Sequence, residues 1–317
     1  MNKCKICNNS ENNNIFLINE MQFGYFDKFK YMECSKCGCL QLIDIPDDLS
    51  KYYPQNYFSL SVDEAKNPKD FMQILIRKLT IYYYSNRNKL IIKLIYFMFP
   101  ELFTLTITKE NMGFLFNCKI LDVGCGAGSL LYTLKLAGFN NLYGIDPYIN
   151  ENISYDNKIY IYKSDILAHN DMYDIIMLNH SLEHIVEQEK TMNKIYSLLN
   201  KNGICIIRIP TVSCYSWFKY KEYFYHLDAP RHIFIHSIKS IKLLCLKCGF
   251  KIKSINYDSL DATLRSKLYK KGWNYEKQNK FIYSSFGIIF FILDKIFCKI
   301  LNRIKKGNSI KIVIYKE

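Results

Sequence analysis

Between residue 118 and about residue 257, short hydrophobic runs alternate with segments whose hydrophobic positions recur every three or four residues. The short runs are typical of buried strands, and the recurring spacing is typical of helices that pack one face on a sheet. The helical segments SLLYTLKLAG and QEKTMNKIYSLLNKNG are expected to end at Gly138 and Gly203, because glycine favours helix C-termini. This alternation predicts an α/β fold with a mostly parallel sheet. The predicted strands are CKILDV, NLYGID, KIYIYK, YDIIML, GICIIRIP, FKIKSINY and the closing SIKIVIYKE.

The rest of the chain carries different patterns, and we predict three parts. Residues 1–45 hold two Cys-x-x-Cys pairs, residues 46–117 form an aromatic and mostly helical connection, and residues 118–317 form the α/β domain. Residues 263–306 interrupt that domain as a basic, apolar helical insertion before the last strand. The first residues, MNKCKICNNS, lack the hydrophobic stretch of a signal peptide, so we expect a cytoplasmic protein.

The formal net charge of +14 suggests a nucleic-acid partner, but the residue types argue against one. Only six of the 43 basic residues are Arg, the residue preferred for bidentate contacts with phosphates and bases. The excess of Lys accompanies many Ile, Asn and Tyr residues, a composition that AT-rich genomes produce throughout their proteins. A nucleic-acid substrate is therefore disfavoured.

The stretch ILDVGCGAGSLL joins the first predicted strand to the first predicted helix through a glycine-rich turn. A dinucleotide fingerprint would place its third glycine at position 129, where the chain has Ser129. Asp122 precedes the turn, and its carboxylate would repel a phosphate but attract a cation. Glycines also occur at such junctions for purely structural reasons, so the loop alone leaves both interpretations open.

The following strands end in polar residues as well. Asp146 lies in GIDP, Asp165 in KSDIL, and the fourth strand runs into LNHSLEHI. Because open α/β sheets bind ligands at the carboxyl ends of parallel strands, we expect these residues to surround one ligand.

In this order, ILDVGCGAG, GIDP, SD and DIIMLNHSLEHI, followed by LLNKNGICIIRIP, resemble the motifs of class I S-adenosylmethionine-dependent methyltransferases. The resemblance covers about residues 118–257 and a last strand near 309–315. It implies a Rossmann-like, doubly wound, mostly parallel seven-stranded sheet and S-adenosyl-L-methionine as cofactor. It also implies that Asp122 lies near the ammonium group, Asp146 holds the ribose and Asp165 the adenine amine. The cofactor site implied in this way comprises Asp122, Gly124, Cys125, Gly126, Gly128, Asp146, Pro147, Asp165, Ile166, Asn179 and His180.

The two Cys-x-x-Cys pairs near the start of the chain have the spacing of a metal site. Cys4, Cys7, Cys34 and Cys37 supply four thiolates, as a closed tetrahedral structural zinc site requires. The alternative is that they are free buried cysteines. Cys245 and Cys248 form a third pair, but this pair has no partner and lies in a helical pattern, so we expect it to pack as small hydrophobic residues.

The leader CKIC…YMECSKCGCLQL resembles the zinc-knuckle leader of a bacterial methyltransferase subgroup found with cell-surface polysaccharide and small-molecule biosynthesis. Members share a segment like HLDAPRHIFIHS, residues 226–237. The resemblance implies a small-molecule or glycan acceptor. An RNA base methyltransferase with a zinc-binding leader is the alternative, and a non-enzymatic scaffold that binds zinc and cofactor is a third hypothesis.

Methyl transfer to a hydroxyl needs a base that removes the proton, and His is the commonest choice. We predict His232 as the base and His184 as the second candidate, although His184 fits equally well as a residue that orients its loop. The fourth strand is followed by NHSL, without the prolines typical of nucleobase amino-methyltransferases. O-methylation is therefore preferred, with N- or C-methylation of a small molecule left open.

Residues 263–306 contain eleven basic and two acidic residues around the apolar run FGIIFFIL. A membrane-spanning helix needs roughly 20 apolar residues, so this run is too short to span a membrane. A helix with this composition suits an anionic membrane surface, such as the inner face of the cell membrane. The alternative is a helix packed on the methyltransferase core with its lysines solvated.

Overall fold

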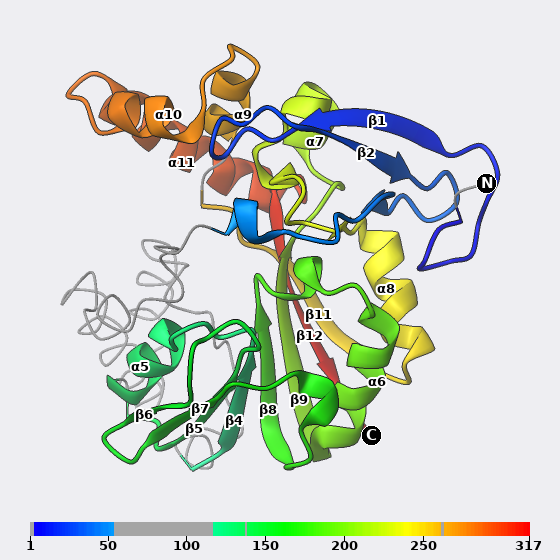
Figure 1. Ribbon diagram of the computed structural model, residues 1–317, viewed down its shortest axis with the longest axis vertical. Coiled ribbons are helices and arrows are strands. Elements are labelled where there is room, and N and C mark those ends of the chain that lie inside the picture. Colours follow the sequence, from blue (N-terminus) through cyan, green and yellow to red (C-terminus); the bar gives the residue numbers. More distant parts are fainter. Residues whose placement is uncertain (1–2, 54–116, 137, 261–262) are drawn as a thin grey trace. The chain divides into compact units, whose positions relative to one another are not determined.

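A computed structural model describes residues 3–53, 117–136, 138–260 and 263–317 of the chain (Figure 1). Most of the predicted connection 46–117 thus lies outside the described residues. The chain forms two compact units. The first comprises Met1–Pro54, His180–Tyr196 and Ile207–Tyr315, and the second comprises Gln55–Asn179, Ser197–Ile206 and Lys316–Glu317.

The first unit contains a four-stranded sheet that joins the Cys-rich leader to a segment far along the chain. Its strands are β1 (Asn14–Asn19), β2 (Lys28–Glu33), β3 (Leu40–Leu42) and β10 (Phe234–Ile235), in that order. The Leu42 N–H donates to Ile233 O at 2.8 Å, and the Tyr31 hydroxyl donates to His232 O at 2.8 Å. The leader therefore forms one structure with residues 226–237.

Short helices and a strand pair complete the first unit. The short helices are η1 (Ser50–Tyr52), η5 (Leu182–His184), α6 (Gln188–Leu198), α7 (Tyr215–Tyr220), η6 (Lys221–Tyr223), η7 (Tyr225–Leu227) and α8 (Ile238–Lys247). Strand β11 (Lys251–Tyr257) pairs antiparallel with β12 (Ser309–Tyr315), which lies next to β9 (Leu199–Pro210).

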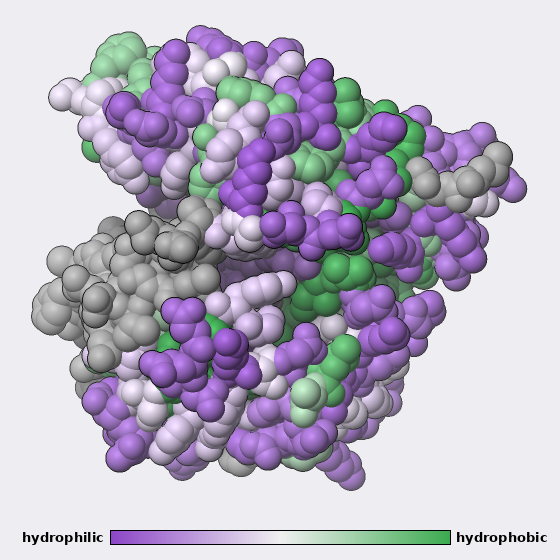
Figure 2. Space-filling view, in the orientation of Figure 1, coloured by the Kyte–Doolittle hydropathy of each residue, from purple (hydrophilic) through white to green (hydrophobic). Residues whose placement is uncertain are grey.

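The predicted insertion 263–306 is helical. It forms α9 (Thr263–Tyr269), α10 (Tyr275–Ile282) and α11 (Gly287–Arg303). Hydrophobic side chains, drawn in green, reach the surface at the upper left, where α10 and α11 lie (Figure 2).

The second unit carries a mostly parallel part of the large sheet. Its strands are β4 (Lys119–Val123), β5 (Asn141–Ile145), β6 (Ile153–Tyr155), β7 (Ile159–Tyr162) and β8 (Tyr173–Asn179), with the first part of β9. The order is β9-β8-β4-β5-β7-β6. Strand β4 pairs in parallel with both β5 and β8, so the chain continues outward from β4 in two directions. Such a switch point leaves a crevice for ligands at the carboxyl end of β4.

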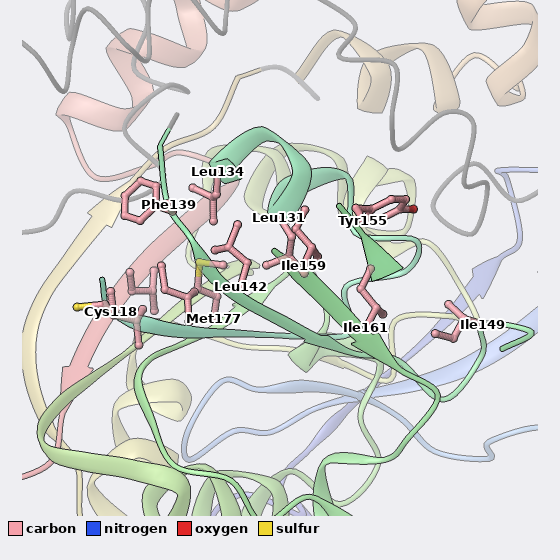
Figure 3. Packing of buried hydrophobic residues seen from close by; sticks show 13 residues of the cluster. Cys118, Leu131, Leu134, Phe139, Leu142, Ile149, Tyr155, Ile159, Ile161 and Met177 are labelled. Atoms are coloured by element: carbon pink, nitrogen blue, oxygen red, sulfur yellow. The ribbon is translucent and has the colours of Figure 1, made fainter. Parts of the chain in front are cut away.

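The core of the second unit is a cluster of buried aliphatic and aromatic side chains from the sheet and α5 (Ser129–Leu136) (Figure 3). Leu131 and Leu134 of α5 lie over Leu142 and Ile159 of the strands. Burying residues of this size from both elements holds α5, and with it the glycine turn at its N-terminus, against the sheet.

Two sequence expectations need correction. Among the described residues, the large sheet has eight strands rather than seven, because the short β6 adds an antiparallel strand beside β7. The helix α6 ends at Leu198 instead of Gly203, since β9 begins at Leu199 and the Gly203 carbonyl accepts a hydrogen bond from the Lys316 N–H at 3.3 Å. The helix α5 ends near Gly138, as expected. The φ of Gly138 is 104°, and its N–H donates to Lys135 O at 2.9 Å.

Candidate functional site

The glycine turn after β4 has a backbone that only glycine adopts easily. Gly124, Gly126 and Gly128 have φ angles of 73°, 55° and 85°, all in the left-handed region. A Cβ on Gly128 would lie 2.3 Å from Ile161 Cδ1. The Tyr155 hydroxyl of β6 donates to Ala127 O at 2.8 Å, so the unpredicted strand β6 also supports the turn.

Asp146, at the end of β5, is tied to this turn. Its carboxylate accepts hydrogen bonds from the Gly126 N–H and the Tyr148 N–H, both at 2.8 Å. Each oxygen keeps a further lone pair, which leaves acceptors for two ligand hydroxyls. Burial raises the pKa of Asp146, while the two N–H groups lower it.

Asp122 is only 3% exposed, and burial together with the charge of Asp146 raises its pKa to about 8. A cation that binds beside two buried carboxyl groups stabilises their ionised forms, which burial otherwise disfavours. A phosphate would have the opposite effect. The turn therefore fits a positively charged ligand that carries neighbouring hydroxyls.

The other predicted cofactor residues of the second unit lie at the same edge of the sheet. Two of them, Cys125 and Ile166, direct their side chains toward the protein interior. Asp165 is exposed and caps η4 (Ile166–Ala168) by accepting the Leu167 N–H at 2.7 Å. Pro147 is exposed, and Asn179 has a buried Oδ1 without a hydrogen-bond partner among the described residues. In contrast, the half-buried Cys125 side chain packs against the core, and the Ile166 side chain is buried.

In the first unit, histidines from two segments meet. The rings of His184 and His232 lie 4.7 Å apart in an edge-to-face arrangement. His184 Nδ1 lies 2.9 Å from Arg231 O, and His232 Nδ1 lies 2.8 Å from His226 O. Because a carbonyl only accepts, each Nδ1 carries a proton, so in a neutral imidazole the lone pair lies on Nε2.

Carboxylates accompany these imidazoles. Asp228 Oδ2 lies 3.7 Å from His232 Nε2, and the Arg231 guanidinium donates to both Asp228 oxygens at 2.6 and 2.7 Å. Burial opposes ionisation of Asp228, but Arg231 and His232 lower its pKa. Burial beside His232 lowers the pKa of His184 to about 4.

His180 also belongs to this cluster. Its Nδ1 lies 3.3 Å from Glu183 Oε1. Burial disfavours the charged form of Glu183, yet the hydrogen bond and charge of His180 outweigh it and lower the pKa to about 2. Glu183, His184 and His232 each place one donor atom within 4.8 Å of the others, so this trio could also hold a metal ion.

Sequence reasoning named the histidines but missed Glu183, Asp228 and Arg231. Their spacing was a usable signal, because Glu183 follows His180 by three residues and Asp228 precedes His232 by four.

Comparison with known proteins identifies the family. A family model described as a methyltransferase domain matches residues 83–255, more than half of the chain. The chain belongs to the methyltransferase domain family. The matched range leaves out the Cys-rich leader and the helical insertion, so it bears on neither.

Individual relatives of this methyltransferase domain are distant. It is 28% identical over 110 residues to the ubiquinone biosynthesis O-methyltransferase of Rickettsia prowazekii, a match that covers 31% of this chain and 42% of the relative's length. A SAM-dependent methyltransferase from Archaeoglobus fulgidus superposes with a TM-score of 0.41 at 19% identity, covering 70% of this chain and 99% of that one. An S-adenosylmethionine-dependent methyltransferase from Mesorhizobium loti gives a TM-score of 0.40 at 11% identity, covering 63% and 91%.

The leader of this methyltransferase brings its four cysteines together. Cys4 Sγ lies 3.6 Å from Cys37 Sγ, Cys7 Sγ lies 3.4 Å from Cys34 Sγ, and all four sulfurs lie within 4.8 Å of one another. Tetrahedral zinc with Zn–S bonds of about 2.3 Å places sulfurs roughly 3.8 Å apart, so the four thiols fit a zinc ion. The third pair behaves as predicted, since Cys245 is fully buried on α8 and Cys248 is buried at its end.

Proposed function

We propose that this methyltransferase transfers a methyl group from S-adenosyl-L-methionine to a hydroxyl of a small molecule or glycan. The observation that carries the proposal is the pair of buried carboxylates, Asp122 and Asp146, beside the glycine turn. The donor has a sulfonium, an ammonium and two ribose hydroxyls, which are the features that these carboxylates can bind. The name of the distant Rickettsia relative supports oxygen as the acceptor atom.

When bound, the donor supplies an activated methyl group for an in-line displacement. The residues of this chain then hold the donor and take up the acceptor proton. Asp146 accepts from the ribose hydroxyls, Asp122 balances the positive charge, and Asp165 and Asn179 offer acceptors toward the adenine and the methionine portion. Holding both reactants at attack distance supplies much of the acceleration.

His232 is the base in this proposal. In the neutral ring its Nε2 carries the lone pair, and Asp228 Oδ2, 3.7 Å from that atom, would stabilise the imidazolium formed when the acceptor proton is taken up. His184 is a weaker base at neutral pH, because its pKa lies near 4. We assign it a positioning role, in which its ring packs against that of His232.

We also propose a structural zinc ion bound by Cys4, Cys7, Cys34 and Cys37. Its role is to hold the leader sheet, which contacts the cluster through the Tyr31 hydroxyl and the His232 carbonyl. The polysaccharide or secondary-biosynthesis context that the leader resemblance implies belongs to the same proposal.

The acceptor class can be found with methyl-labelled donor. Purified full-length protein is incubated with separate sugar, lipid and RNA fractions, and the label is followed into each. We expect label in sugar or lipid-linked fractions as an alkali-stable methyl ether. Label in RNA alone would overturn the proposed acceptor class in favour of a base methyltransferase, whose RNA binding would weaken steeply with salt.

A further inference from the structure

Helix α11 has two apolar sides. Gly287, Cys298 and Leu301 are buried on one side with Asp294. The other side carries large aliphatic residues spaced four, three, four and four apart, which places them in one line along the helix. This α11 stripe consists of Ile289, Leu293, Ile296, Ile300 and the C-cap residue Ile304, whose exposed fractions lie between 50% and 59%.

The stripe is not the scatter of single apolar residues that water-facing surfaces usually carry. Phe286, next to the start of the helix, is 65% exposed, and Tyr283 is 76% exposed. Some hydrophobic side chains are visible at the surface in the region of α10 and α11 in Figure 2. Packing on the protein core accounts for the buried side of α11 only.

A row of basic residues runs beside the stripe. Lys295, Lys299 and Arg303 are spaced four apart, and all three are exposed. Lys305 and Lys306 follow the helix and are exposed as well. The one acidic residue of α11, Asp294, is buried and accepts the Leu264 N–H at 2.9 Å, so the exposed side of α11 carries positive charge only.

The length of α11 suits a surface position. Its 17 residues measure about 25 Å at roughly 1.5 Å per residue. Among the described residues no single helix meets the length and hydropathy needed to cross a bilayer, although α10 and α11 do so jointly across a bend of 100°. A helix with an apolar stripe, aromatic residues at one end and a lysine row lies in the interface plane of a membrane.

We propose that α11 binds the surface of an anionic lipid membrane, with the α11 stripe among the acyl chains and the basic row against the headgroups. A second copy of the chain would also cover the stripe, but it would bring two rows of like charge together. Anionic headgroups instead attract juxtamembrane lysines and arginines. This inference stands apart from the proposed methyl transfer, and its test measures binding alone.

The test is flotation of the full-length protein with vesicles of phosphatidylcholine alone or with one third phosphatidylglycerol. We expect the protein to float with anionic vesicles at low salt and to return to the soluble fraction at high salt, since screening weakens surface charge attraction. Ile296→Glu/Ile300→Glu should lower the bound fraction at least tenfold, and Lys295→Glu/Lys299→Glu should do so on anionic vesicles. The matched controls Ile15→Glu/Leu17→Glu on β1 and Lys158→Glu/Lys163→Glu in the second unit should float like the parent.

Three results would overturn the inference. The parent could stay soluble at low salt, or it could bind neutral and anionic vesicles equally. It could also form dimers in light scattering that Ile296→Glu/Ile300→Glu dissolves, which would make the stripe an interface between copies. The substituted positions are exposed, so we expect each variant to fold. Circular dichroism of each variant checks that its fold is retained.

Discussion

The glycine turn of the second unit and the histidine cluster of the first unit are built in opposite ways. The turn comes from residues 122–128, and Asp146 joins it from the end of the next parallel strand. The cluster draws on residues 180–184 and 226–232 and rests on the leader through Tyr31. Charge differs as well, because burial raises the pKa of acids at the turn and lowers that of His184 in the cluster. The glycine turn therefore favours a cationic ligand, and the histidine cluster keeps the His184 imidazole neutral.

Loss of the zinc site should have the largest effect on the histidine cluster while leaving the glycine turn unaffected. Cys4→Ser/Cys34→Ser removes two of four ligands, and structural zinc supplies much of the folding free energy of small leaders. We expect elemental analysis to fall from one zinc per chain to none, with turnover lost because the leader no longer supports His232. Donor affinity by calorimetry should stay near that of the parent. Zinc retained in the variant would mean that the ligands lie elsewhere, and Cys245→Ser/Cys248→Ser is the control that should keep it.

His232→Ala tests the cluster directly. Removing a general base lowers turnover by about a hundredfold or more. The donor should still bind as tightly as before, since its proposed ligands lie in the second unit. His169→Ala, whose ring contacts Tyr173 in the second unit, is the matched control and should leave turnover within a fewfold. Equal losses in turnover and donor affinity would make His232 a structural residue.

Asp146→Ala tests the turn in the same way. Loss of a charged hydrogen-bond acceptor costs about 1.5–3 kcal/mol, or roughly one to two orders of magnitude in donor affinity. Asp171→Ala, an exposed carboxylate paired with Lys119, serves as control. Unchanged affinity by calorimetry in Asp146→Ala would remove this residue from the donor site.

The same contrast explains what the sequence could predict. All seven expected strands are present, and the turn residues follow one another in the chain, so local patterns sufficed for them. The pairing of β3 with β10 joins residues 40–42 to 234–235, and no local pattern reports such a contact. Strand β6 is three residues long, too short to show alternation.

The last prediction concerns Asp122 and the way in which donor affinity changes with pH. Its pKa near 8 in the donor-free protein means that it is protonated at neutral pH, and a cationic donor favours the ionised form. Donor binding should therefore release a proton, and affinity should fall by up to about tenfold per pH unit below pH 8. The same raised pKa stabilises the donor-free fold at low pH, and this contribution is lost as pH rises toward 8, because the folded state binds more protons than the unfolded chain. Calorimetry in buffers of different ionisation enthalpy measures the proton released, and Asp122→Asn should release none and flatten the pH dependence. If the donor affinity of the parent protein is constant from pH 6 to 9, Asp122 does not contact the positive charge of the donor. The prediction that the turn binds a cationic ligand would then be wrong.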